Sequence, residues 1–305
     1  MESITLSGLS SRGRRSGCNR YLSPLLFRPL KVKGSQGSAL SGVKGQSPLP
    51  SLPGASGLWA VGITRGLLAL AALALIAASP LPEAPPLHPS GGFTPAGPQS
   101  ARGAVVWLAG SYDTDTEPMP PEQPWVARLA ARGYDIWRFD RTPGRDPLKP
   151  GGEALIAGLQ RLHEAGYRHV IVAGHSRGAF IALAALAHPD LAEAVAVIDP
   201  AAHGPRPERA AQSLADLGDR LDAAQGPMRF AFVQLRNDPF ALDADARAGM
   251  VGKAAERAGL SLLLIDRPPA PEGHLGGFDA AFDALFGECL ARFTAGEAAR
   301  EGCRP

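Results

Sequence analysis

The 305-residue sequence lacks the features that favour a metal-binding, nucleic-acid-binding or membrane-spanning protein. The chain has 3 cysteines, and the two late ones, Cys289 and Cys303, have no histidine or carboxylate at metal-ligand spacing. Aromatic residues make up 6% of the chain, and no basic groove with interleaved aromatics can be traced. A permanent membrane span needs about twenty apolar residues, and no such run is present. We therefore expect no metal, no nucleic-acid partner and no stable membrane span.

The net charge of +2 conceals an asymmetry along the chain. Residues 1–60 contain eight basic residues and a single acid, Glu2, so this stretch carries +7 and the remainder −5. The stretch is rich in Ser, Gly, Pro and Arg without apolar periodicity, which predicts a disordered leader. Because an export signal normally stands at the start of a chain, we hypothesise that translation starts downstream, with Val61 as the candidate, and that residues 1–60 are not expressed.

Residues 61–79 have the pattern of a secretory signal peptide. Arg65 supplies a positive charge, and about twelve apolar residues follow it at 67–78. Pro80 disfavours cleavage directly before it, so an uncleaved anchor formed by 67–78 stays the alternative. We expect export to the periplasm or secretion. Residues 80–100 are rich in Pro and Gly and predict a linker.

The two late cysteines fit an exported protein. Cys289 falls in the last predicted helix and Cys303 in the tail beyond it. In an oxidising compartment they would pair as a disulfide and pin the carboxyl terminus. The alternative is two unrelated thiols.

From residue 101 to 305, short apolar runs alternate with helical patterns. Strands are predicted at 103–109, 134–139, 169–173, 194–198, 229–235 and 262–265, and helices at 121–132, 153–166, 178–188, 205–225, 243–258 and 278–294. This alternation predicts an α/β domain with a mostly parallel sheet and helices on both faces. About thirty residues separate the fourth and fifth predicted strands, so any lid is one helix. No Gly-x-Gly-x-x-Gly follows the first strand, which argues against dinucleotide binding.

The main chemical signal is Gly174-His175-Ser176-Arg177-Gly178, a Gly-x-Ser-x-Gly motif between a predicted strand and an apolar helix. A serine nucleophile must sit on a sharp strand-to-helix turn, where only glycine fits on either side. The helix that follows favours negative charge at its start. The motif therefore predicts Ser176 as a nucleophile.

This context resembles the α/β-hydrolase superfamily, in its esterase- and lipase-like serine hydrolases, over about residues 101 to 294. The resemblance implies the chain order nucleophile, acid, histidine, with the histidine after the last strand. His274 meets this demand, in a loop flanked by Gly273 and Gly276. His203 follows an earlier strand and is the rival to test.

Two aspartates are candidates for the acid that orients the histidine. Asp238 follows the strand at 229–235 and matches the family's usual place, while Asp199 ends the preceding strand and is the alternative acid. Both precede a proline, so each also has a structural interpretation as the start of a turn.

An oxyanion hole needs two backbone N–H groups. The resemblance implies Arg177, directly after the nucleophile, as one donor. The other comes from the loop after the first predicted strand, where we favour Ser111, with Tyr112 next. The family more often has His-Gly where this chain has Ala109-Gly110, which leaves the register open by one residue.

These residues predict an exported carboxylic-ester hydrolase that acts on a small-molecule ester through an acyl-enzyme, without cofactor or metal. The alternatives are a peptidase or thioesterase with the same triad, and a non-catalytic binding protein on the same scaffold.

Overall fold

A computed structural model describes residues 87–111, 120–141 and 147–297. All of them belong to the second of the two units into which the chain divides, residues 73–305. The predicted leader, the apolar segment 67–78 and Cys303 lie outside the described residues, so export, anchoring and the disulfide stay predictions. Within the described ranges, no helix combines the length and hydropathy needed to cross a membrane.

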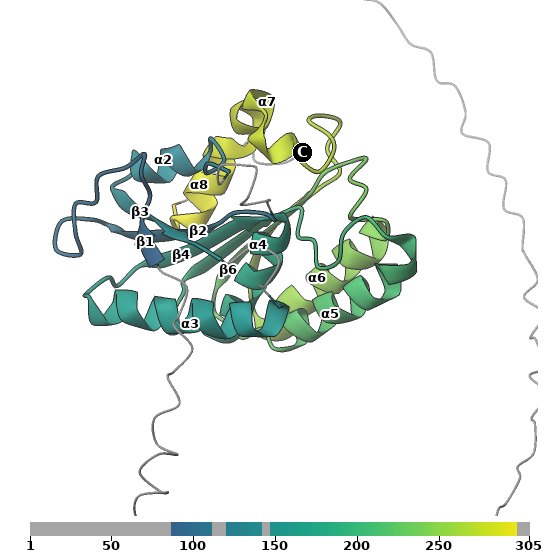
Figure 1. The fold of residues 1–305 in the computed structure, drawn as a ribbon, viewed down its shortest axis with the longest axis horizontal. Helices are drawn as coiled ribbons and strands as arrows, with labels where there is room; N and C mark the ends of the chain where they lie inside the picture. The colour runs from purple at the N-terminus through teal and green to yellow at the C-terminus, as the bar shows by residue number, and fades with distance from the viewer. Residues whose placement is uncertain (1–86, 112–119, 142–146, 298–305) are drawn as a thin grey trace, which may run out of the picture. The chain divides into compact units, whose positions relative to one another are not determined.

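The described domain is built on a seven-stranded sheet in the order β1-β3-β2-β4-β5-β6-β7 (Figure 1). All neighbouring pairs are parallel except β1 with β3. The six parallel strands lie within two residues of their predicted bounds. The strands are β1 Leu87–Pro89, β2 Gly103–Leu108, β3 Tyr134–Phe139, β4 Val170–His175, β5 Ala194–Ile198, β6 Arg229–Gln234 and β7 Ser261–Asp266.

The first strand corrects the sequence interpretation, which placed residues 80–100 in a linker. Residues 87–89 instead form an antiparallel edge strand, with Leu87 opposite Phe139. A segment of three residues that ends in proline is too short to show the alternation of apolar and polar residues that predicts a strand. Proline cannot donate a hydrogen bond to a neighbouring strand, so it suits an edge strand. This strand is held by its pairing with β3, which the local sequence does not encode.

Helices cover both faces of the sheet (Figure 1). One layer contains α3 Leu148–Glu164, α4 Ser176–Ala182, η1 Leu183–Ala187, α5 Ala210–Asp222 and α6 Ala244–Ala258, and η2 Pro207–Arg209 leads into α5. The other contains α2 Val126–Ala130 and the C-terminal elements η3 Gly276–Phe278, α7 Ala280–Phe282, η4 Asp283–Gly287 and α8 Glu288–Thr294. The single helix predicted at 278–294 is thus a broken series, and α3 begins before its predicted start.

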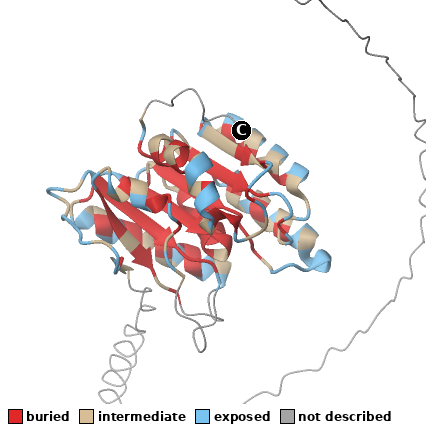
Figure 2. Cartoon of the chain, turned by 90° about the horizontal axis from the view of Figure 1, so that it is seen from above, coloured by how far each residue is buried: buried red, intermediate tan, exposed pale blue. Residues whose placement is uncertain are grey.

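Two hydrophobic clusters, one on each face of the sheet, form the core. Val106 and Phe230 belong to the cluster under α3 to α6, whereas Trp107 and Ile171 belong to the one under α2 and α8. Buried positions run the length of the central strands (Figure 2). Such close-packed interiors resist deformation. The sheet is therefore a rigid frame for the loops that leave the carboxyl ends of its strands.

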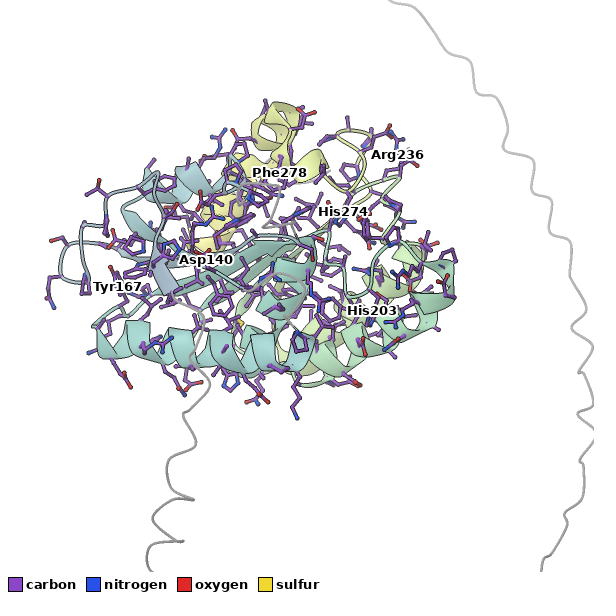
Figure 3. The ribbon with its side chains drawn as sticks, viewed as in Figure 1. Asp140, Tyr167, His203, Arg236, His274 and Phe278 are labelled. Atoms are coloured by element: carbon purple, nitrogen blue, oxygen red, sulfur yellow. The ribbon has the colours of Figure 1, made fainter. Side chains whose placement is uncertain are left out.

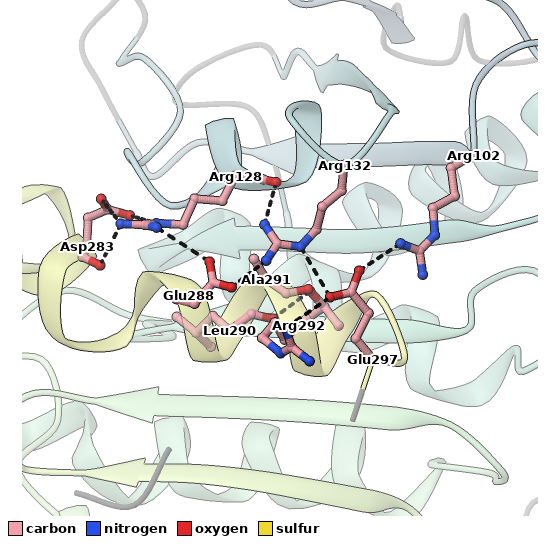
Figure 4. Close-up of polar contacts among 10 residues, drawn as sticks. Arg102, Arg128, Arg132, Asp283, Glu288, Leu290, Ala291, Arg292 and Glu297 are labelled. Atoms are coloured by element: carbon pink, nitrogen blue, oxygen red, sulfur yellow. Dashed lines mark hydrogen bonds and ion pairs between the residues drawn. The ribbon is translucent and has the colours of Figure 1, made fainter. Parts of the chain in front are cut away.

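Ion pairs join α2 to the C-terminal elements (Figure 4). Arg128 donates to Asp283 at 2.7 Å, and Arg132 donates to Glu288 at 2.6 Å. Each half-exposed pair contributes little by itself. Together they join α2 and the residues just after it to η4 and α8.

Candidate active site

The Gly-x-Ser-x-Gly motif, residues 174–178, forms a sharp turn between β4 and α4, called the elbow below. Ser176 has a φ of 54°, a left-handed backbone conformation that residues other than glycine rarely adopt. A Cβ at Gly174 would lie 2.8 Å from the Ala179 nitrogen, and one at Gly178 would lie 2.2 Å from the Ala109 oxygen. Both glycines are therefore required by close backbone approach. The strained turn holds the Ser176 side chain at the start of α4.

Two further loops bring an imidazole and a carboxylate to this serine. The Ser176 hydroxyl lies 2.8 Å from His274 Nε2, and His274 Nδ1 lies 3.0 Å from Asp238 Oδ2. Since the Asp238 carboxylate can only accept a hydrogen bond, His274 Nδ1 must carry the hydrogen. Nε2 is then free to accept a hydrogen bond from the serine hydroxyl. Asp238 is fixed in turn, because its Oδ1 accepts a hydrogen bond of 2.8 Å from the Phe240 N–H. The structure thus brings together Ser176, His274 and Asp238.

Asp199, the alternative acid, is placed elsewhere. Its Oδ1 accepts a hydrogen bond of 2.7 Å from the Leu235 N–H, and its side chain is buried against the end of β6. Burial, with the neighbouring charge of Asp238, raises the pKa of Asp199 well above its usual range. The Nδ1 of His274 is occupied by Asp238, so the geometry favours Asp238 over Asp199 as its partner.

His203, the rival histidine, is also turned away from the serine. Its Nε2 donates to Asp216 on α5, and its Nδ1 accepts from Arg209 at 3.1 Å. The first contact ties the segment after β5 to α5, and the second ties it to η2, which leads into α5. In Figure 3, His203 lies below His274, beside that helix.

The loop after β2 approaches the serine from a third side. Arg141, buried at the end of β3, donates from Nη2 to the carbonyl oxygens of Ala109 and Gly110, the latter at 2.8 Å. In a trans peptide the N–H points opposite to the C=O. With the Gly110 oxygen turned to Arg141, the Ser111 N–H therefore points to the other side of the peptide. Tyr112, the alternative donor, lies outside the described residues.

A cavity of about 260 Å³ opens over the serine. Arg177 is the only described lining residue that carries a fixed charge, and its side chain donates to the Ala202 carbonyl at 2.8 Å. The Phe240 ring stacks on the His274 imidazole at a centroid distance of 4.0 Å. At the rim, Leu275 is 68% exposed. The lining comprises Gly110, Ser111, Pro120, His175, Ser176, Arg177, Ala201, Ala202, Gly204, Phe240, His274, Leu275 and Phe278.

The order of the strands in the sheet, and the order in which Ser176, Asp238 and His274 follow them along the chain, identify the fold. The serine follows β4 at an elbow, the aspartate follows β6 and the histidine follows β7, all at one edge of a mostly parallel sheet. The chain adopts the α/β-hydrolase fold. This confirms the predicted fold class. Two described helices, η2 and α5, lie between β5 and β6, and neither contributes a residue to the lining of the cavity in this α/β-hydrolase fold.

Comparisons with known proteins found similarity to the solved structures named below at 16% sequence identity or less. No family description matches the sequence, and no curated protein matches it. Among solved structures, the Pyrococcus furiosus esterase Pf2001 is 16% identical, with 65% of this chain and 85% of that chain covered and a TM-score of 0.43. The Paleococcus ferrophilus monoacylglycerol lipase is 13% identical, with 70% and 98% covered and a TM-score of 0.47. Brefeldin A esterase is 16% identical, with 69% and 70% covered and a TM-score of 0.43.

Two contacts near the α/β-hydrolase elbow are not predicted by the sequence. Arg141 fixes the loop that carries Ser111, and His175 contacts the backbone of His274. Arg141 is one of several arginines that follow strands, and nothing in its local sequence marks it out. His175 stands inside the motif, but a partner 99 residues away has no local signal.

Proposed function

We propose that the protein is a serine hydrolase that cleaves carboxylic esters. The observation that carries the proposal is the Ser176 hydroxyl at 2.8 Å from His274 Nε2, with Asp238 on the opposite ring nitrogen. A hydroxyl so placed can lose its proton to the imidazole as it attacks. Asp238 keeps the required tautomer and stabilises the imidazolium without taking the proton.

In the first half of the reaction, Ser176 Oγ bonds to the ester carbonyl carbon while His274 Nε2 takes the hydroxyl proton. The carbonyl electron pair moves to the oxygen, where the backbone N–H groups of Ser111 and Arg177 would stabilise it. The bond to the alcohol oxygen then breaks. The imidazolium returns its proton to the departing alcohol, and an acyl-serine remains.

In the second half, water replaces the alcohol. His274 Nε2 accepts a proton from the water as its oxygen attacks the acyl carbon. The tetrahedral species collapses, the bond to Ser176 Oγ breaks, and the serine regains its proton from the imidazolium. The products are a carboxylic acid and the free enzyme, with no cofactor in either step.

The cavity supports a small substrate. At about 260 Å³ it lies below the roughly 300–1,000 Å³ that holds drug-sized ligands. Phe240, Phe278 and Leu275 give it an apolar side next to His274. We therefore expect esters with short acyl groups to be better substrates than those with long chains.

Steady-state assays on p-nitrophenyl esters of increasing acyl length test this function, with matched thioesters and peptide anilides alongside. We expect turnover of short-chain esters by the wild type, with at least a 10³-fold loss in Ser176→Ala. Faster turnover of thioesters or anilides would replace the ester assignment by one of those activities. Equal inertness of wild type and Ser176→Ala with every substrate would contradict the proposal and favour the non-catalytic binding protein.

A further inference from the structure

His175, the residue before the nucleophile, contacts the candidate site at a second point. Its Nε2 donates to the main-chain carbonyl oxygen of His274 at 2.7 Å. Its ring is buried, with its centroid 4.8 Å from that of His274 and 5.0 Å from that of Phe278. The imidazole therefore fills the space between the elbow and the loop that carries His274.

The two neighbouring residues of β4 and α4 thus bind one histidine at two places. Ser176 contacts the imidazole at Nε2, and His175 contacts the backbone of the same residue. One contact is made by the end of the His274 side chain and the other by its main-chain carbonyl. Together they fix the distance from the His274 backbone to the serine oxygen.

In the loop that carries His274, residues 267–279, the hydrogen bonds just before His274 come from residues that follow β6. The Gly273 N–H donates to the Arg236 carbonyl at 2.7 Å, and Asn237 Nδ2 donates to Glu272 at 2.7 Å. These contacts lie before His274, where Gly273 turns the chain with a φ of 79°. Figure 3 shows Arg236 and His274 on these adjoining segments. His175 holds the loop at His274 itself, from the strand that also carries the nucleophile.

The environment of His175 suits a permanent donor. Burial is the main reason that its pKa is lowered to about 4, so the ring is neutral at ordinary pH. A carbonyl faces Nε2, so that nitrogen carries the hydrogen. On the opposite side of the ring, a Cβ at Gly110 would lie 3.1 Å from His175 Nδ1, which is closer than most Cβ contacts, so a side chain at position 110 would press on the ring.

We propose that His175 is a positioning residue that holds the His274 loop by its main-chain carbonyl and so sets the reach of the His274 imidazole to Ser176. The proposal rests on the proposed function, since its effect is on the same reaction. A shift of about 1 Å in a reacting group costs on the order of 10²-fold in rate.

Three substitutions separate the hydrogen bond from the bulk of the ring. His175→Gln places an amide N–H near the position of Nε2, His175→Asn carries the same amide one methylene short, and His175→Phe keeps a ring without a donor. His169→Gln, at an exposed histidine bound to Glu193, is the matched control. For each variant, kcat and KM are measured on a short p-nitrophenyl ester, and folding is checked by thermal unfolding. The proton NMR resonance of His274 Nδ1–H is recorded too, and Asp238→Asn assigns it.

We expect His175→Gln to keep kcat within about threefold of wild type, and the Asn and Phe variants to lose about 10- to 100-fold in kcat with KM little changed. The Nδ1–H resonance should persist in the Gln variant and shift or broaden in the other two. Equal kcat in the folded Asn and Phe variants and the wild type, or an equal loss in all three variants, would overturn the proposal. If the wild type turns over no ester, the proposed function fails, and the Nδ1–H resonance alone tests the positioning role. An unchanged resonance in the Asn and Phe variants would then refute that role.

Discussion

Gly178 of the nucleophile elbow and Ala109 of the loop after β2 approach so closely that no side chain fits between them. A Cβ at Gly178 would lie 2.2 Å from the Ala109 carbonyl oxygen and 2.3 Å from that of Leu108. Both neighbours are backbone atoms, which cannot move aside as a flexible side chain can. The elbow and the proposed oxyanion loop therefore depend on each other for their shape.

Gly178→Ala should accordingly lose both stability and activity. We expect overpacking to cost about 1–3 kcal/mol in the free energy of unfolding, and kcat to fall as the loop is displaced. Gly249→Ala is the matched control, because Gly249 lies on α6 with nothing within 4 Å of the added Cβ. That variant should gain about 0.5–1 kcal/mol. Wild-type unfolding temperature and kcat in Gly178→Ala would contradict this interpretation.

Substitution of the two candidate acids should give opposite results. Asp238→Asn removes the carboxylate that accepts from His274 Nδ1, and we expect kcat to fall by about 10⁴-fold, as loss of the triad acid does elsewhere. Asp199→Asn keeps an oxygen that can accept from the Leu235 N–H, so its kcat should stay within a few-fold of wild type. Steady-state ester hydrolysis measures both. The reverse ranking would make Asp199 the acid.

Arg141 should matter for rate although it lies behind the loop. Arg141→Gln removes the guanidinium that binds the Ala109 and Gly110 carbonyls, and the Ser111 N–H would lose its fixed direction. Loss of one oxyanion donor costs about 10²–10³-fold, so a misdirected donor should cost at least about 10-fold in kcat, with KM little changed. Arg257→Gln, at a half-exposed arginine paired with Asp222, serves as control. A folded Arg141→Gln variant with the control's kcat would rule out this role.

The buried His175 should make the protein sensitive to acid. Its pKa is about 4 in the folded state against about 6.5 in the unfolded chain, so the unfolded state binds more protons as the pH falls through this window. The contribution of His175 to the free energy of unfolding is fully present above about pH 6.5. It should be about 2 kcal/mol smaller at pH 5. Urea unfolding at pH 7.5 and pH 5 measures it. In His175→Gln the loss between the two pH values should be smaller by about that amount, whereas identical losses would show that His175 does not titrate in this way.

Much of the fold follows from local sequence because the parallel strands are continuous apolar runs. The run from Val170 to Ala173 is buried on both faces, so it carries a strong signal, and β4 was predicted to within two residues. Leu87–Pro89 carries none, since its strand exists only through pairing with β3. The apolar spacing of the C-terminal elements continues across the breaks between them, so the sequence predicts one helix where the structure has several.

The candidate site was predictable only in part. Ser176 is marked by its own motif, and His274 by chain order and flanking glycines. Asp238 and Asp199 have nearly the same local signal, an aspartate before a proline at a strand end, and only the direction of their side chains separates them. The contacts of Arg141 and His175 join residues more than thirty positions apart, so they depend on the packed sheet rather than on any local pattern.

The most direct test of the account is covalent labelling with a fluorophosphonate, followed by peptide mapping by mass spectrometry. The reagent reports a serine made nucleophilic by its neighbours, whatever the natural substrate is. The account predicts one phosphonyl group per chain, located on Ser176, with labelling abolished in Ser176→Ala and strongly slowed in His274→Ala. A folded wild-type protein that stays unlabelled, or that carries the adduct on another residue, would contradict it.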